Sequence, residues 1–134
     1  RAAMRGRDRA LVLELQRGLY RAMAEVATPK AGLSRLRARI DAAAVAELDE
    51  QVERLRERAD VEGRFVVPGE DPASASLDVA RTVARRAERS VVRLVDAKTV
   101  DGEHVVPWLN RLSDVLFLLA RAVEKRPRAA RKVT

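Results

Sequence analysis

The chain has 134 residues, a formal net charge of +7, 47% hydrophobic and 3% aromatic residues, and no cysteine. This length supports one domain, and a core built from leucine, valine and alanine favours packed helices over a β-sandwich. The cysteine count excludes disulfides and thiolate metal sites, and no apolar stretch approaches the roughly 20 residues of a membrane-spanning helix. We therefore expect an all-α, cytoplasmic protein.

The positive charge is concentrated at the two ends of the chain. Residues 125–134 contain five lysines and arginines, residues 1–9 contain four arginines, and residues 10–124 are close to neutral. We divide the chain into a helical-bundle domain, residues 1–124, and a basic tail, residues 125–134, whose composition is typical of a solvated terminus. A helical nucleic-acid-binding domain is an alternative that depends on the overall charge alone.

Apolar residues at alternating steps of three and four predict a first helix over about residues 8–27, which ends at Pro29 and Gly32. Residues 33–40 combine helical and strand-like spacing, and we treat them as a connection. Asp41 is a suitable N-cap for a second amphipathic helix that continues to about Ala59.

Asp71 and Pro72 are typical of the N-cap and first turn of a third helix. Its apolar stripe consists mostly of alanine, which predicts close helix packing and a central place in the bundle. Pro107 is tolerated only in a first turn, so we expect a fourth helix to begin near His104. Together these segments predict an antiparallel, up-and-down bundle of about four to five helices.

The third helix carries four arginines and one glutamate between residues 81 and 89. Helical spacing places Arg81, Arg85 and Glu88 on one face, with Arg86 and Arg89 in an adjacent row. Because guanidinium groups donate paired hydrogen bonds to phosphate, such a row can hold a triphosphate. A solvated face with ion pairs is the alternative that the residues alone leave open.

On the fourth helix, Asn110 and Asp114 lie four residues apart on the side away from the leucines. A buried asparagine that only fixes helix register is the alternative interpretation. With one histidine, His104, and no cysteine, we expect no protein-held metal site. We expect Trp108 and Phe117 to be packing residues.

Three motifs occur in the order found in one enzyme family: Phe65-Val66-Val67-Pro68-Gly69, the arginine-rich residues 81–89, and Asn110-Arg111-Leu112-Ser113-Asp114. Over about residues 11–123 the chain resembles the cob(I)alamin adenosyltransferases of the propanediol-utilisation type. The resemblance implies transfer of the 5′-deoxyadenosyl group from ATP to Co(I) of cobalamin or another corrinoid, with release of triphosphate. It also implies Mg²⁺ as a cofactor and a homotrimer with ATP bound between subunits.

The resemblance assigns a role to each candidate site residue. Arg85 is implied to be the catalytic residue, on the phosphates, and Phe65 is implied to face the corrin and keep the lower axial ligand off cobalt. Arg81 is implied to pair with an acidic residue of the N-terminal region. The implied ATP-binding residues are Arg81, Arg85, Arg86, Glu88, Arg89 and Asn110.

Three features depart from the family pattern. Glu70 replaces the second glycine of the usual Pro-Gly-Gly, and Asp78 stands where the family commonly has histidine. Both add negative charge near the expected corrin side, which bears on cobalamin affinity. The family's usual Gly-rich N-terminal segment does not occur in this sequence. A non-catalytic relative that binds nucleotide or corrinoid, as a carrier or sensor, is therefore an alternative.

Overall fold

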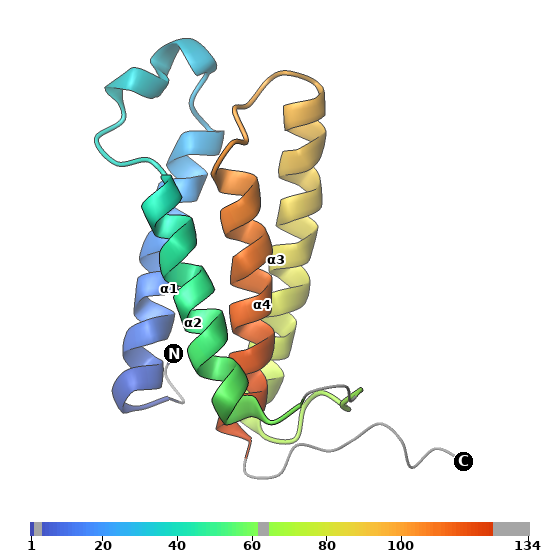
Figure 1. The fold of residues 1–134 in the computed structure, drawn as a ribbon. Helices are drawn as coiled ribbons and strands as arrows, with labels where there is room; N and C mark the ends of the chain where they lie inside the picture. The colour runs from blue at the N-terminus through green and yellow to red at the C-terminus, as the bar shows by residue number, and fades with distance from the viewer. Residues whose placement is uncertain (2–3, 62–64, 125–134) are drawn as a thin grey trace.

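The computed structural model describes residues 1, 4–61 and 65–124, so the expected basic tail at residues 125–134 lies outside the described residues. Within them, four α-helices run alternately up and down (Figure 1). These are α1 (Gly6–Val26), α2 (Ala42–Ala59), α3 (Pro72–Asp96) and α4 (Val105–Val123), and a short 3₁₀ helix, η1 (Lys30–Arg35), follows α1. The predicted all-α antiparallel bundle is confirmed. No helix in the described ranges is long and apolar enough to cross a membrane.

The predicted starts of α2 and α3 are confirmed by their capping contacts. The Asp41 carboxylate accepts a hydrogen bond from the backbone N–H of Ala44 at 2.8 Å. At the start of α3, the Asp71 carboxylate accepts from the N–H groups of Ala73 and Ser74, both at 3.0 Å, and the Ser74 hydroxyl accepts from the Asp71 N–H at 3.2 Å. These side chains satisfy backbone donors that have no partner within the helix.

The central helix of the bundle is α4, which packs along both α2 and α3 and touches α1 more sparsely. Figure 1 shows α4 between α2 and α3. The prediction that α3 is central is wrong, because its extensive contacts are with α4 and its outer side exposes Val79 and Val83. A narrow stripe of small residues allows one close neighbour, whereas the wide apolar surface of α4 must be covered from several sides. The buried hydrophobic residues of α4 are Val105, Trp108, Leu109, Leu112, Val115, Leu116, Leu118, Leu119 and Ala120.

Helix α1 meets the centre of the bundle where Gly18 faces Trp108. A Cβ atom on Gly18 would lie 2.2 Å from Cζ2 of the buried Trp108 indole, far inside van der Waals contact. The missing side chain therefore makes room for the indole. Trp108 is buried, as expected for a packing residue.

Near the end of α1, a charged network joins three segments of the chain. Glu25, only 2% exposed, accepts hydrogen bonds from Arg39 Nε and from the Ile40 N–H, both at 2.9 Å. Arg39 also donates to Asp101 in the loop between α3 and α4, at 3.3 Å. The pKa of the Asp101 carboxyl is lowered, chiefly by the backbone N–H of Glu103 and further by Arg39, against the opposing effect of burial. The connection over residues 36–41 is thus fixed to two other parts of the fold.

Candidate functional site

The arginine-rich segment lies in the middle of α3, and its four arginines are exposed to solvent. Glu88 is more enclosed, with its side chain 13% exposed, and its Oε2 pairs with Arg85 Nη1 at 3.3 Å. The α-helical spacing of three residues brings these two side chains to the same face. Arg85 and Glu88 therefore form the pair that the sequence predicts.

A chain of hydrogen bonds extends from this pair across three helices. The second oxygen of Glu88, Oε1, accepts from Asn110 Nδ2 at 3.0 Å. The Asn110 Oδ1 accepts from Arg111 Nη1 at 3.0 Å, and Arg111 Nε donates to Asp49 on α2. We call Arg85, Glu88, Asn110, Arg111 and Asp49 the relay. It brings together three of the predicted ATP-binding residues.

The relay fixes the orientation of the Asn110 amide. Its oxygen faces a donor, Arg111, and its nitrogen faces an acceptor, Glu88, so rotating the amide by 180° would place like groups together. The sequence analysis did not identify Arg111 and Asp49 as site residues. Arg111 adjoins Asn110, which was an available signal, whereas Asp49 lies on another helix and gives no local signal.

The other three arginines keep their charge uncompensated within the described chain. Arg81 lies with its guanidinium carbon 5.3 Å from the centroid of the Phe117 ring, a cation–π geometry. No carboxylate among the residues that the structure describes pairs with Arg81, Arg86 or Arg89. The implied pairing of Arg81 with an N-terminal acidic residue therefore stays a prediction. Free guanidinium groups on one helix form a local positive field that attracts anions.

Phe65 lies in the loop before α3 and is 88% exposed to solvent. Gly69 has φ of +88°, a left-handed conformation that glycine adopts without strain, and its N–H donates to Asp78 Oδ2 at 3.2 Å. The structure places this loop at the first turn of α3 and the arginines further along the same helix.

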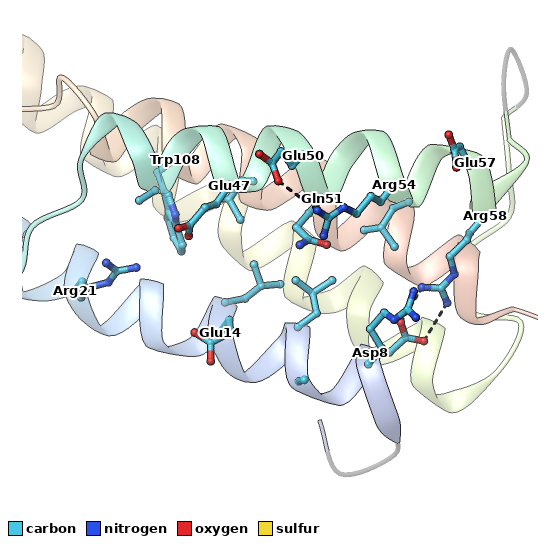
Figure 2. A pocket seen from close by; sticks show the side chains of 17 residues that line it. Asp8, Glu14, Arg21, Glu47, Glu50, Gln51, Arg54, Glu57, Arg58 and Trp108 are labelled. Atoms are coloured by element: carbon cyan, nitrogen blue, oxygen red, sulfur yellow. Dashed lines mark hydrogen bonds and ion pairs between the residues drawn. The ribbon is translucent and has the colours of Figure 1, made fainter.

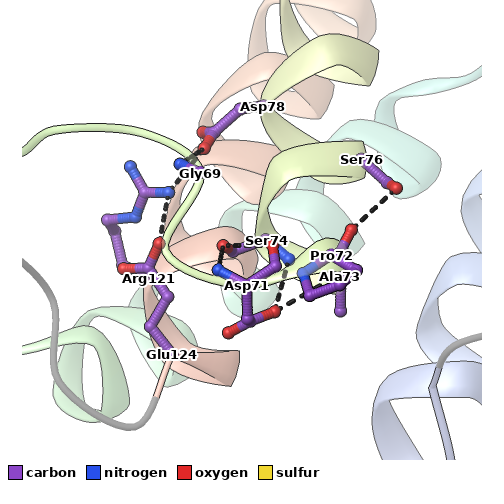
Figure 3. A network of polar contacts seen from close by, with 9 residues as sticks. All are labelled: Gly69, Asp71, Pro72, Ala73, Ser74, Ser76, Asp78, Arg121 and Glu124. Atoms are coloured by element: carbon purple, nitrogen blue, oxygen red, sulfur yellow. Dashed lines mark hydrogen bonds and ion pairs between the residues drawn. The ribbon is translucent and has the colours of Figure 1, made fainter.

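Asp78 has an ion-pair partner, which it shares with Glu124. Arg121 Nη2 on α4 lies 2.7 Å from Asp78 Oδ2, as Figure 3 shows. This ion pair was not predicted, although an arginine among the buried leucines of α4 was a signal for a buried partner. The carboxylate of Asp78 is therefore held against α4.

Neither of two cavities in the described part is lined by the arginines of α3. A cavity of about 710 Å³ lies between α1 and α2, and none of the predicted site residues lines it (Figure 2). A depression of about 480 Å³ adjoins the relay and is lined in part by Asp49, Arg111 and Asp114. Among the described residues, no three His, Cys, Asp or Glu side chains come close enough to hold a metal ion. The candidate site is thus an open, basic helix face.

Comparisons with known proteins agree with the resemblance seen in the motifs. The chain is 37% identical over 113 residues to the corrinoid adenosyltransferase of Citrobacter freundii, covering 84% of this chain and 64% of that one. It is 34% identical over 121 residues to the corrinoid adenosyltransferase PduO of Salmonella typhimurium, covering 90% of this chain and 36% of that one. The chain therefore spans less than two thirds of the length of these relatives.

A solved structure shares the fold. It is a variant of a PduO-type ATP:corrinoid adenosyltransferase from Lactobacillus reuteri, complexed with cobalamin and ATP, with a TM-score of 0.79 and 26% identity. The similarity covers 91% of this chain and 69% of that one. The family model for cobalamin adenosyltransferase matches residues 2–123, which include the Phe65 loop, the arginine-rich helix and the relay. The chain belongs to the cobalamin adenosyltransferase family.

Proposed function

We propose that this protein transfers the 5′-deoxyadenosyl group of ATP to the Co(I) centre of a corrinoid such as cobalamin. The observation that carries the proposal is the relay, which gathers Arg85, Glu88 and Asn110 from two helices in a chain that matches the adenosyltransferase family model. The relatives' names and the cobalamin and ATP bound in the similar structure support it. They do not favour the nucleic-acid or non-catalytic alternatives.

The chemistry is a displacement at carbon. The electron pair of Co(I) forms a bond to C5′ of the ribose, the C5′–O bond breaks, and triphosphate leaves with the electrons of that bond. No proton needs to move, so the protein needs no general base. Its task is to align the substrates and to stabilise the charge that develops on the leaving triphosphate.

The arginines of α3 suit this task. Arg85 is held by Glu88, so its guanidinium is oriented before the triphosphate arrives, while Arg86 and Arg89 supply further positive charge. A preorganised donor of this kind is commonly worth about 3 kcal/mol of the activation barrier. Phe65 would face the corrin. The described residues do not form a magnesium site by themselves, so Mg²⁺ would be held by the triphosphate.

We further propose that the active protein is a homotrimer with ATP bound between subunits. The support is that Val79 and Val83 are exposed on the side of α3 away from α4, where a second subunit can pack. Light scattering should then give three times the chain mass of 14.9 kDa. A monomer at working concentration would contradict this arrangement. The cytoplasmic location stays a prediction.

The test of the activity is an anaerobic assay with chemically reduced cobalamin, ATP and Mg²⁺, following loss of the Co(I) absorbance. We expect turnover by the wild type and a loss of at least about 100-fold in kcat/KM for Arg85→Ala. The melting temperature of this variant should stay within about 3 °C, because an exposed ion pair contributes little stability.

Arg17→Ala is the matched control. Arg17 is also an exposed arginine that pairs with a glutamate three residues away, Glu14, but it lies on α1 outside the candidate site. This variant should keep wild-type activity. Full activity in Arg85→Ala would contradict the role of Arg85, and binding of both substrates by the wild type without turnover would contradict the proposed activity itself.

A further inference from the structure

Asp78 joins the loop that carries Phe65 to the far end of α4. One carboxylate oxygen, Oδ2, accepts a hydrogen bond from the Gly69 N–H at 3.2 Å and another from Arg121 Nη2 at 2.7 Å (Figure 3). The first contact reaches the loop, and the second reaches a buried residue of the central helix. Asp78 is therefore the point at which the loop is fixed to the core.

On the α4 side, the partner of Asp78 is a buried arginine. Arg121 is 1% exposed, and its Nη2 also donates to Glu124 Oε1 at 2.9 Å. Its guanidinium carbon lies 5.5 Å from the centroid of the Phe117 ring, the same ring that Arg81 covers from 5.3 Å. A buried arginine with several partners has few alternative rotamers, so it holds the Asp78 carboxylate in one place.

The loop side depends on a specific backbone conformation. Gly69 adopts φ of +88°, and this turn directs its N–H toward Asp78. Four residues earlier, Phe65 presents 88% of its surface to solvent. An exposed phenylalanine gains no burial energy within the chain, so an anchored loop that presents one is preorganised to give that apolar surface to a ligand.

We propose that Asp78 is a positioning residue for the corrinoid, acting through its hydrogen bond to Gly69 rather than through its charge. The proposal rests on the proposed function, because it names Phe65 as the group that meets the corrin. Asp78 does not touch the substrate in this account. The Asp78 carboxylate holds the loop through the Gly69 N–H, and Arg121 holds the Asp78 carboxylate in position.

Two substitutions separate the hydrogen bond from the charge. Asp78→Asn keeps an oxygen acceptor for the Gly69 N–H but removes the charge that pairs with Arg121, whereas Asp78→Ala removes both. Both variants should melt at lower temperature, because each removes one of the two carboxylates that pair with buried Arg121. Only Asp78→Ala should raise the KM for cob(I)alamin, by about tenfold, with the KM for ATP changed less than about twofold.

Hydrogen exchange at the Gly69 amide tests the anchor without reference to activity. We expect exchange at least about fivefold faster in Asp78→Ala than in the wild type, and near wild-type exchange in Asp78→Asn. Asp101→Ala is the control for lost stability, since Asp101 pairs with Arg39 near the opposite end of α3 and has no contact with the loop. It should lower the melting temperature and leave the Gly69 exchange and the cob(I)alamin KM unchanged.

The outcomes are distinguishable. Unchanged Gly69 exchange in Asp78→Ala would overturn the anchor, and faster exchange with an unchanged cob(I)alamin KM would overturn the positioning role. A rise in KM of equal size in Asp78→Asn would show that the charge acts instead of the hydrogen bond. If the wild type shows no turnover, the proposed function fails, and equilibrium binding of cobalamin to the same variants decides the positioning role.

Discussion

At the scale of single residues, Gly18 decides how α1 packs against the core. A methyl group there would lie 2.2 Å from Trp108 Cζ2, and the indole is enclosed in the core. Gly18→Ala gains up to about 1 kcal/mol of helix propensity, but overpacking costs about 1–3 kcal/mol, so the clash should win. We expect a net loss of about 1–2 kcal/mol in unfolding free energy, measured by urea denaturation.

A double-mutant cycle identifies the cause. In a Trp108→Leu background the indole is absent, so Gly18→Ala should cost nothing or should stabilise the protein through its helix propensity. An equal loss in both backgrounds would show that Trp108 is not the group that excludes the methyl. The sequence gives no hint of this contact, because a glycine in a helix does not reveal which side chain takes its place.

At the scale of helices, the relay connects the candidate ATP-binding residues of α3 to α2 through α4. Arg111 is 42% exposed, so Arg111→Ala should change stability little, yet it removes the donor that orients the Asn110 amide. We expect kcat/KM for ATP to fall about tenfold, which corresponds to about 1.4 kcal/mol of transition-state stabilisation. Steady-state kinetics under anaerobic conditions measures this change.

Arg54→Ala is the control for this prediction. Arg54 is an exposed arginine of the neighbouring helix α2 that pairs with Glu50, and it takes no part in the relay. Its substitution should leave kcat/KM for ATP unchanged. Wild-type kinetics in Arg111→Ala would show that Asn110 keeps its orientation without Arg111.

The helices themselves follow from local chemistry. Asp41 and Asp71 supply capping oxygens and Pro72 fits a first turn, so the sequence is sufficient to locate the starts of α2 and α3. The short 3₁₀ helix after α1 was expected only as a connection. The chain after it is held by Glu25, which accepts hydrogen bonds from Arg39 and Ile40, and these contacts join residues 14 and 15 positions apart.

At the scale of the whole molecule, Asp101 links stability to pH. Its pKa is lowered in the folded state, so between the folded pKa and the ordinary value of about 3.9 the unfolded chain binds more protons than the folded protein. The stabilisation is therefore complete above about pH 5 and is lost as the pH falls through the folded pKa. Asp101→Asn should remove this part of the acid sensitivity.

Urea unfolding of the wild type and of Asp101→Asn over about pH 2 to 6 measures the effect. The difference in unfolding free energy between the two proteins should be constant above about pH 5 and should shrink toward low pH. A difference that does not change with pH would contradict the role of the Asp101 charge.

The sequence by itself determined the four α-helices and their antiparallel order, and it singled out the residues of the candidate site. Capping residues, apolar periodicity and the three motifs each involve only residues that are close in sequence, so they can be recognised without the tertiary structure. The roles given to Arg85, Glu88 and Asn110 were implied by the family resemblance, and they remain proposals.

Only the tertiary structure decided which helix is central and which distant residues meet. The place of α4, the link from Asp49 to Arg111 and the ion pair between Asp78 and Arg121 join segments far apart in the chain. The physical reason is that periodicity shows which face of a helix is buried but not which neighbour covers it. Likewise, a charged residue type does not reveal its partner.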